Sequence, residues 1–188
     1  MKILIVSGFL GAGKTTFIKR LARNVDQRFA ILENEYGAAG IDGARLGQNR
    51  QGTQKNVWEM TEQCICCIGK KDFAASVLTI ANVVDPEYLI VEPTGVGSLA
   101  RIIENLRQIE YERIQLLSPV TIVDVYSYRR YMAEYPELYQ DQIRSADTII
   151  VSKTEACQAE EKQRIQKFLQ EINPQAKIIT DYASTMTR

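Results

Sequence analysis

A glycine-rich stretch near the N-terminus constrains the fold more than any other feature of the sequence. Residues 8–15 read GFLGAGKT and match the pattern G-x-x-x-x-G-K-[ST] at every defined position. An apolar run, residues 2–6, precedes this stretch, and apolar residues at helical spacing follow it over residues 17–25. A strand, a glycine-rich loop and a helix in this order form a phosphate-binding loop. The sequence therefore predicts an α/β fold whose first loop binds the phosphates of a nucleotide.

The residue types in this loop have distinct expected roles. Glycine allows backbone torsions and a close approach of phosphate that a Cβ atom blocks. Successive peptide N–H groups and the helix N-terminus present partial positive charge to the phosphates. Lys14 is expected to contact the β- and γ-phosphates, and the Thr15 hydroxyl is expected to ligate Mg²⁺. The residues expected to bind the nucleotide in this loop are Gly8, Gly11, Ala12, Gly13, Lys14, Thr15 and Thr16.

The rest of the chain alternates short apolar runs with segments of helical spacing. The runs are nearly continuous, which is typical of parallel strands that are buried on both faces. Predicted strands are residues 2–6, 29–32, 88–91, 120–125, 148–151 and 177–180. Predicted helices include residues 17–25, 73–80, 99–106 and 165–172, and residues 37–54 are expected to form a long surface loop. This order predicts one α/β domain over residues 1–188, with a doubly wound, mostly parallel sheet of the P-loop NTPase class.

Two of the predicted strands lead to a carboxylate. Residues 88–91 deliver Glu92 to the carboxyl edge of the sheet, where ligands bind in open α/β folds. We expect Glu92 to hold Mg²⁺, directly or through water; a solvated acid at a strand end is the alternative. Gly95, three residues later, is expected to offer its backbone N–H to a γ-phosphate. Asp124 is a second such carboxylate, and a role in a turn or a cap is its alternative.

A short polar segment after the predicted strand 148–151 suggests which base is bound. Residues 152–155 read SKTE, which departs from the guanine-reading pattern N-K-x-D at its first and last positions. A carboxylate at Glu155 suits the N1 and N2 donors of guanine, and the stem of Lys153 is expected to pack along the base. An ordinary polar turn is the alternative. The segment therefore favours guanine and leaves a strict preference for GTP over ATP open.

A cluster of thiols is the second chemically distinctive feature. Cys64, Cys66 and Cys67 are three of the four cysteines, and the chain contains no histidine. Three soft ligands and a fourth from elsewhere or from solvent form a tetrahedral site for Zn²⁺ or another soft metal. Buried, inert thiols are the alternative, because free cysteine is commonly buried. Cys157 is expected to be structural. The lack of histidine excludes Ser-His-Asp triads and imidazole metal ligands.

Composition excludes several classes of partner. Lys plus Arg and Asp plus Glu each total 23, so the chain carries no net charge. This balance argues against binding to nucleic acid or to anionic lipid by bulk charge. No apolar stretch approaches the ~20 residues of a membrane-spanning helix. The N-terminal apolar run is also too short for a signal peptide. With its clustered thiols, the chain is expected to be a cytoplasmic protein.

The motifs taken together resemble the CobW-type GTPases. The stretches GFLGAGKTT, ENEYG, CICC, LIVEPTG and TIVDV carry the resemblance, which spans roughly residues 1–182. These proteins belong with the metallochaperone GTPases of hydrogenase and urease maturation. The resemblance implies GTP hydrolysis coupled to the binding of a metal, often zinc, and its delivery to a client metalloprotein. It also implies that Cys64, Cys66 and Cys67 are the metal thiolates and that Glu92 is the Mg²⁺-site carboxylate.

The resemblance further assigns a switch-like segment and shows two departures. Glu35 lies in that segment and joins Lys14 and Glu92 as an expected catalytic residue, and the loop 37–54 is expected to become ordered on GTP binding. Ala38 stands where many members have an acidic residue. The C-terminal domain that members usually carry is not expected within residues 1–188. Slow turnover is expected, because lacking an arginine finger or a catalytic glutamine costs ~10³–10⁵ in rate in related NTPases.

Two other functions remain open at this point. A P-loop kinase that acts on a small molecule would need the phosphate-binding loop but not the thiols. A nucleotide switch without metal would act on a partner protein or through a homodimer. A group of tyrosines bears on that choice, because it either packs on the sheet or forms an interface. Its members are Tyr126, Tyr128, Tyr131, Tyr135 and Tyr139, of which the last four share one helix face unless Pro136 breaks the helix.

Overall fold

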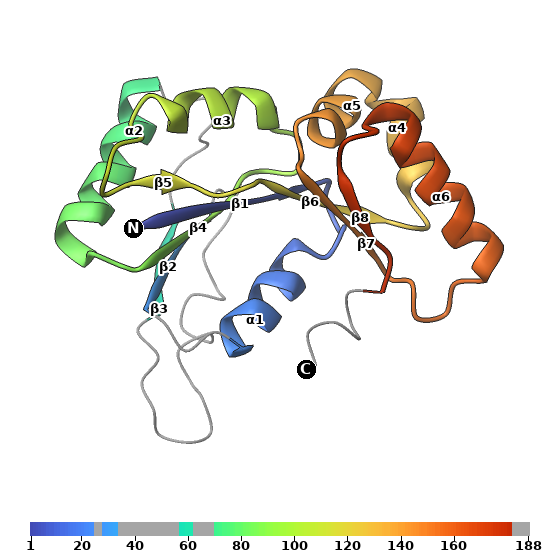
Figure 1. Cartoon of the computed structure of the whole chain (residues 1–188), viewed down its shortest axis with the longest axis horizontal. Coiled ribbons are helices and arrows are strands. Elements are labelled where there is room, and N and C mark those ends of the chain that lie inside the picture. The colour runs from blue at the N-terminus through green and yellow to red at the C-terminus, as the bar shows by residue number, and fades with distance from the viewer. Residues whose placement is uncertain (25–27, 34–56, 62–69, 182–188) are drawn as a thin grey trace.

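The computed structural model describes residues 1–24, 28–33, 57–61 and 70–181, which form a parallel sheet with helices on both faces (Figure 1). The order of the strands is β3-β2-β4-β1-β6-β7-β8, with β5 beside β1, and every pairing between named strands is parallel. The strands are β1 (Lys2–Gly8), β2 (Phe29–Glu33), β3 (Val57–Thr61), β4 (Tyr88–Glu92), β5 (Gln115–Leu116), β6 (Val120–Asp124), β7 (Thr148–Ser152) and β8 (Lys177–Ile179). The predicted doubly wound α/β architecture is therefore confirmed.

The helices follow the predicted alternation with the strands. They are α1 (Lys14–Asn24), α2 (Lys70–Thr79), which continues into a π-helical turn (Ile80–Val84), α3 (Leu99–Arg107), α4 (Tyr128–Glu134), α5 (Pro136–Arg144) and α6 (Ala159–Ile172). None of the described helices is long and apolar enough to cross a membrane. Each of the four predicted helical stripes lies in an observed helix, although residue 25 is outside the described part of the chain.

Two apolar layers cover the sheet, one on each face. The smaller layer contains Phe17 and Ile18 of α1. The larger layer contains apolar side chains of α2, α3, α4, α5 and α6, which Figure 1 shows opposite α1. The direction of the crossovers explains this division. The connection from β1 to β2 contains α1 and runs toward the β3 end of the sheet. The later connections, from β3 to β4, β4 to β6, β6 to β7 and β7 to β8, contain the other helices and run toward the β8 end. Right-handed crossovers therefore place α1 on one face and the other helices on the opposite face.

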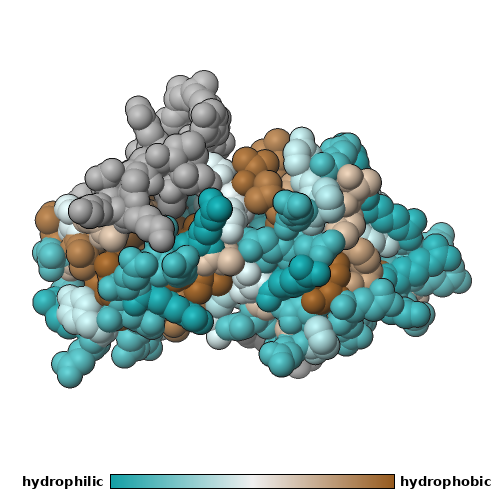
Figure 2. Space-filling model, turned by 90° about the horizontal axis from the view of Figure 1, so that it is seen from above, coloured by the Kyte–Doolittle hydropathy of each residue, from teal (hydrophilic) through white to brown (hydrophobic). Residues whose placement is uncertain are grey.

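The register of the strands brings several loops to one edge. Ile5 pairs with Val91, Glu33 with Glu92, and Gly8 with Ile122. All these strands are parallel, so the loop after β1, the end of β2 and the loop after β4 meet at the carboxyl edge of the sheet. Seen from the side of α2 to α5, the coloured surface is mostly hydrophilic with separate apolar patches (Figure 2).

The structure adds two strands that the sequence did not predict. β3 is a short edge strand whose sequence, VWEMT, mixes polar and apolar residues and therefore lacks the continuous apolar run of a central strand. β5 has only two residues, QL. The loop predicted for residues 37–54 lies outside the described residues.

The tyrosine-rich segment is two helices rather than one. α4 ends at Glu134, and Pro136 is the first residue of α5. Proline has no N–H to donate and its ring clashes with the preceding turn, but both properties are tolerated at the first position of a helix. Pro136 therefore separates Tyr128 and Tyr131 from Tyr139, and the condition under which these residues would share one helix face is not met.

Candidate functional site

The loop between β1 and α1 has the conformation that its sequence predicts. Gly8, Gly11 and Gly13 all have positive φ angles, of 142°, 73° and 99°. Gly8 is also required for packing, because a Cβ atom there would lie 2.5 Å from the carbonyl oxygen of Ile122 on the adjacent strand β6. The loop leads directly into α1 at Lys14. The backbone is thus shaped to direct its N–H groups and the start of α1 toward one point.

This loop forms one wall of a cavity of about 590 Å³ at the carboxyl edge of the sheet. The cavity brings together most of the predicted phosphate-binding residues with Glu92 and Gly95. Its lining residues are Leu10, Gly11, Gly13, Lys14, Thr15, Thr16, Glu33, Glu92, Pro93, Thr94, Gly95 and Val96. Lys14 is buried at the start of α1. The cavity therefore combines a buried cation with a loop suited to an anion.

Oxygen ligands for a hard cation meet in the same cavity. The Thr15 hydroxyl donates a hydrogen bond of 3.3 Å to Oε1 of Glu92. Glu33, at the end of β2, pairs with Glu92 in the sheet and also lines the cavity. A hydroxyl and carboxylates are the ligands that Mg²⁺ prefers, so the donor set fits this ion. Glu33 was not predicted from the sequence, although this residue follows an apolar strand in the same way as Glu92.

The segment predicted to read the base contacts the phosphate-binding loop. Ser152 is 2% exposed, and its Oγ donates a 2.6 Å hydrogen bond to the carbonyl oxygen of Ala12. Lys153, the next residue, has a positive φ of 60°. Glu155 is exposed, and neither Lys153 nor Glu155 is among the described residues that line the cavity. Their contact with a base stays a prediction.

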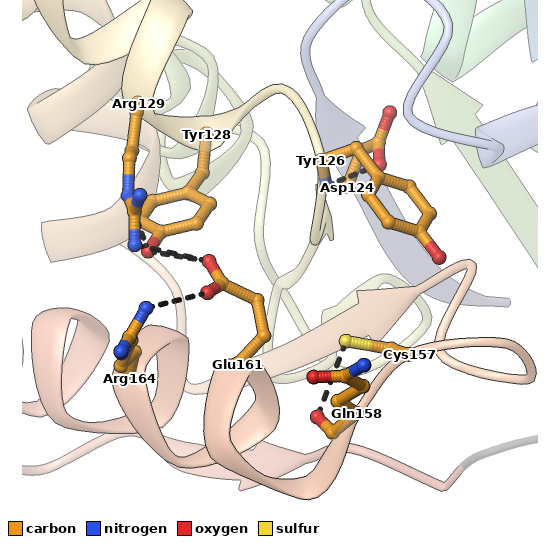
Figure 3. A network of polar contacts seen from close by, with 8 residues as sticks. All are labelled: Asp124, Tyr126, Tyr128, Arg129, Cys157, Gln158, Glu161 and Arg164. Carbon is orange, nitrogen blue, oxygen red and sulfur yellow. Dashed lines mark hydrogen bonds and ion pairs between the residues drawn. The ribbon is translucent and has the colours of Figure 1, made fainter.

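Asp124 is a turn residue that also holds Lys153. Its carboxylate accepts hydrogen bonds of 2.9 Å from the Tyr126 N–H, 2.9 Å from the Ser127 hydroxyl and 2.7 Å from the Lys153 ammonium group. Figure 3 shows Asp124 beside Tyr126 at the end of β6. Burial alone would raise the pKa of Asp124, but these hydrogen bonds and the charge of Lys153 outweigh burial and lower the pKa below its ordinary value of 3.8. Of the two roles left open for Asp124, the described residues show the turn.

Three tyrosines, from α4, from α5 and from the junction between these helices, pack around Phe9 of the phosphate-binding loop. The ring of Phe9 lies 4.8 Å from Tyr131, 5.8 Å from Tyr135 and 5.0 Å from Tyr139, measured between ring centroids. The Tyr131 hydroxyl donates a 2.8 Å hydrogen bond to the carbonyl oxygen of Leu10. Burial raises the pKa of the Tyr139 hydroxyl. Burial and core contacts confirm the packing interpretation for Tyr128, Tyr131 and Tyr139, whereas Tyr126 is 61% and Tyr135 46% exposed.

A polar network fixes α4 against α6. Glu161 accepts hydrogen bonds from the Tyr128 hydroxyl at 3.2 Å, from Arg129 at 3.1 Å and from Arg164 at 3.4 Å, as Figure 3 shows. The Tyr128 ring also packs on Phe168 of α6 at 5.1 Å between centroids. The network therefore holds the helix from which Tyr131 reaches the phosphate-binding loop.

The predicted thiol cluster and one predicted catalytic residue lie outside the described residues. These residues are Glu35, Cys64, Cys66 and Cys67. Within the part of the chain that the structure describes, no group of three Cys, Asp, Glu or His side chains could hold a metal ion. Cys157 packs against the larger apolar layer, and its Sγ lies 3.5 Å from the Gln158 carbonyl oxygen (Figure 3). Its expected structural role fits this position.

Comparison with known proteins gives relatives along most of the chain. The zinc chaperone YeiR of Escherichia coli is 31% identical over 170 residues, covering 89% of this chain and 51% of the relative. The zinc chaperone CobW of Pseudomonas aeruginosa is 27% identical over 194 residues, covering 88% and 52%. The chain thus spans about half the length of these relatives.

Solved structures share the fold. The Zn(II)-bound YjiA GTPase of Escherichia coli superposes with a TM-score of 0.70 at 22% identity, covering 96% of this chain and 57% of that one. HypB of Helicobacter pylori in complex with nickel gives a TM-score of 0.63 at 18% identity, covering 94% and 76%. At these identities the likeness concerns the fold alone.

The family comparison agrees with the geometry of the cavity. The model of the CobW/HypB/UreG nucleotide-binding domain matches residues 2–180, which include the phosphate-binding loop, Glu92 and the segment 152–155. This chain therefore belongs to the CobW/HypB/UreG nucleotide-binding domain family.

Proposed function

We propose that this chain is the nucleotide-binding part of a metallochaperone that binds and hydrolyses GTP and couples its nucleotide state to zinc held by thiolates. The observation that carries the proposal is the cavity where the Thr15 hydroxyl meets the Glu92 carboxylate beside the phosphate-binding loop. Family membership and the zinc-chaperone relatives support the same function. The rival small-molecule kinase would use the same cavity but would have no need for the thiols.

In this proposal the residues of the cavity have separate tasks. The backbone of Gly11, Ala12 and Gly13 binds the phosphates, while buried Lys14 offsets negative charge on the β- and γ-phosphates. Thr15 and Glu92 would hold Mg²⁺, which neutralises charge that develops as the γ-phosphate leaves.

Hydrolysis itself transfers the γ-phosphoryl group to water. The water oxygen bonds to the γ-phosphorus as the bond from that phosphorus to the β–γ bridging oxygen breaks, so the products are GDP and phosphate. Glu35 and Glu92 are the proposed groups that orient the water. Among the described residues that line the cavity there is no arginine, which supports slow turnover without a partner.

Guanine selection is proposed for the segment after β7. Lys153 is held at the end of its strand by Asp124, which limits the positions that its stem can occupy. Glu155, two residues later, would accept hydrogen bonds from the N1 and N2 groups of guanine. Adenine offers an acceptor at N1, so a carboxylate there would repel it.

Metal binding is proposed for Cys64, Cys66 and Cys67, with zinc as cargo. The segment that carries them connects Thr61, the end of β3, to Lys70, the start of α2. Because β3 is parallel to β2 and β4, this segment leaves the sheet from the edge that carries the nucleotide cavity. A shared edge supports energetic coupling between nucleotide and metal, and such coupling is reciprocal.

The proposed partners follow from this activity. A client metalloprotein would accept the zinc, and a homodimer could supply the surface that completes the site. The thiolates require a reducing compartment, which agrees with a cytoplasmic location.

Zinc titration of the reduced protein tests the proposal. Zinc affinity is measured in GDP, in a non-hydrolysable GTP analogue and in the corresponding ATP analogue. We expect the two guanine states to differ by at least about tenfold, a coupling of the usual size. The triple variant C64S/C66S/C67S should lose zinc binding and keep GDP binding, whereas the matched control Cys157→Ser should keep both. Equal zinc affinity in both guanine states would refute the coupling.

A further inference from the structure

A buried glutamine on α5 is not used by the function proposed above. Gln142 is 1% exposed and lies on a helix that packs on the larger apolar layer. Its Nε2 donates hydrogen bonds to the carbonyl oxygens of Gly95 at 3.2 Å and Gly97 at 3.0 Å. Two carbonyl acceptors around one atom fix the orientation of the amide, because an oxygen could not donate to them. Burying an amide in an apolar layer costs free energy unless the amide is hydrogen-bonded, so the two hydrogen bonds to Gly95 and Gly97 offset that cost.

Both partners belong to the loop between β4 and α3, and the neighbouring residue of α5 holds the end of that loop. The Asp141 carboxylate accepts hydrogen bonds from the N–H groups of Leu99 at 2.7 Å and Ala100 at 3.4 Å. Asp141 therefore caps the start of α3, where N–H groups lack partners within the helix. Consecutive side chains of α5 thus bind the loop after Glu92 and the first turn of α3.

The other side of this loop lies against the phosphate-binding loop. A Cβ atom on Gly95 would be 2.7 Å from the backbone nitrogen of Leu10 and 3.2 Å from its Cα atom. Gly95 also lines the nucleotide cavity. Its backbone is therefore held between the phosphate-binding loop and the amide of Gln142.

The hydrogen bonding around Gln142 is incomplete in the described residues. Its Oε1 is buried and no described donor reaches it, and the Ser7 hydroxyl is buried without a described partner. Ser7 directly precedes Gly8 and pairs with Thr121 in the sheet. The Thr121 hydroxyl in turn donates a 2.9 Å hydrogen bond to the backbone carbonyl of Gln142. Buried polar atoms without partners are rare. Among the described residues, Oε1 of Gln142 therefore remains an unused acceptor.

We propose that Gln142 is a positioning residue that holds the peptide groups of Gly95, which lines the cavity, and of Gly97, and thereby fixes the loop after β4 at the γ-phosphate end of the cavity. The loop after β4 then distinguishes GTP from GDP, and α5 follows the position of that loop. Gln142 touches no nucleotide and acts through Gly95. This inference rests on the proposed function, since it requires the cavity to bind guanine nucleotides.

Nucleotide affinities of Gln142→Met test the inference. Methionine keeps the length and the apolar stem of the side chain but donates no hydrogen bond. Loss of this support should weaken binding of a non-hydrolysable GTP analogue about tenfold, the usual effect of an unmade buried hydrogen bond, because only the γ-phosphate uses the held loop. GDP affinity should change by less than about twofold on the same reasoning. The matched control is Gln140→Met on the same helix. The Gln140 amide donates a hydrogen bond to Met132 Sδ at 3.8 Å and, among the described residues, none to the loop after β4, so both affinities should stay unchanged.

The outcomes separate the possible roles of Gln142. Equal losses for GDP and the GTP analogue, or no loss for either, would overturn the inference and leave Gln142 a structural residue. If Gln142→Met does not fold, Gln142→Asn keeps the amide, withdraws it by one methylene and permits the same comparison. Wild-type protein measured alongside distinguishes the two proposals. If the wild type binds no guanine nucleotide, the proposed function fails. If the wild type binds both nucleotides and Gln142→Met has the same ratio of GTP-analogue affinity to GDP affinity, only this inference fails.

Discussion

The contact between Ser152 and Ala12 allows a sharp test of how the base segment supports the phosphate-binding loop. Ser152→Ala removes a hydroxyl whose Oγ donates at 2.6 Å to a loop carbonyl and lies 3.4 Å from the carbonyl of Val123. The site is buried, so water cannot easily replace the lost donor. Leaving a buried acceptor unpaired costs ~1–3 kcal/mol. For a chain of this length, each kcal/mol lowers the unfolding midpoint by roughly 2–4 °C.

The assay separates stability from loop position by means of a control outside the site. Asn173→Ala removes another buried polar group, whose Nδ2 donates to the carbonyls of Ile143 at 2.9 Å and Ala146 at 2.8 Å and touches no part of the phosphate-binding loop in the described residues. Urea unfolding should show a loss of stability for both variants. Fluorescent GDP titration should show an affinity loss of about tenfold for Ser152→Ala only, since one displaced carbonyl alters the adjacent N–H groups. Equal GDP affinities for the two variants would refute the reasoning.

Two further predictions concern Gly95 and Asp124. Gly95→Ala places a Cβ atom 2.7 Å from the backbone nitrogen of Leu10 in the phosphate-binding loop. Because the obstacle is backbone, we expect ~1–3 kcal/mol of destabilisation by chemical unfolding and, since the phosphate-binding loop is displaced, weaker GDP binding. Wild-type values for both would show that the two loops separate without cost. The pKa of Asp124 is lowered in the folded protein, so ionised Asp124 contributes stability above its unfolded pKa and loses that contribution as the pH falls through the folded pKa. The stability advantage of wild type over Asp124→Asn should therefore shrink between about pH 5 and pH 2, and a constant difference in urea unfolding across that range would contradict the assigned contacts.

Much of the fold and half of the site could be predicted because their signals are local. β1, the phosphate-binding loop and α1 are consecutive in the chain, and their pattern specifies strand, turn and helix together. Glu92 was predicted from the buried run before it, since a parallel strand fixes which edge its end reaches. β3 was missed because its short edge sequence has no such run. Glu33 was missed although it obeys the same rule as Glu92.

Only the tertiary structure decided which distant groups support the site. Ser152 holds Ala12 across 140 positions of sequence, and Gln142 holds Gly95 across 47. Neither residue belongs to a periodic pattern or a glycine-rich turn, so nothing nearby in the chain indicates its partner. The sequence determined the elements, because apolar periodicity and backbone conformation are properties of neighbouring residues. The support of the loops was decided by sheet order and crossover direction, because a hydrogen bond between distant residues exists only once packing has brought its donor and acceptor together.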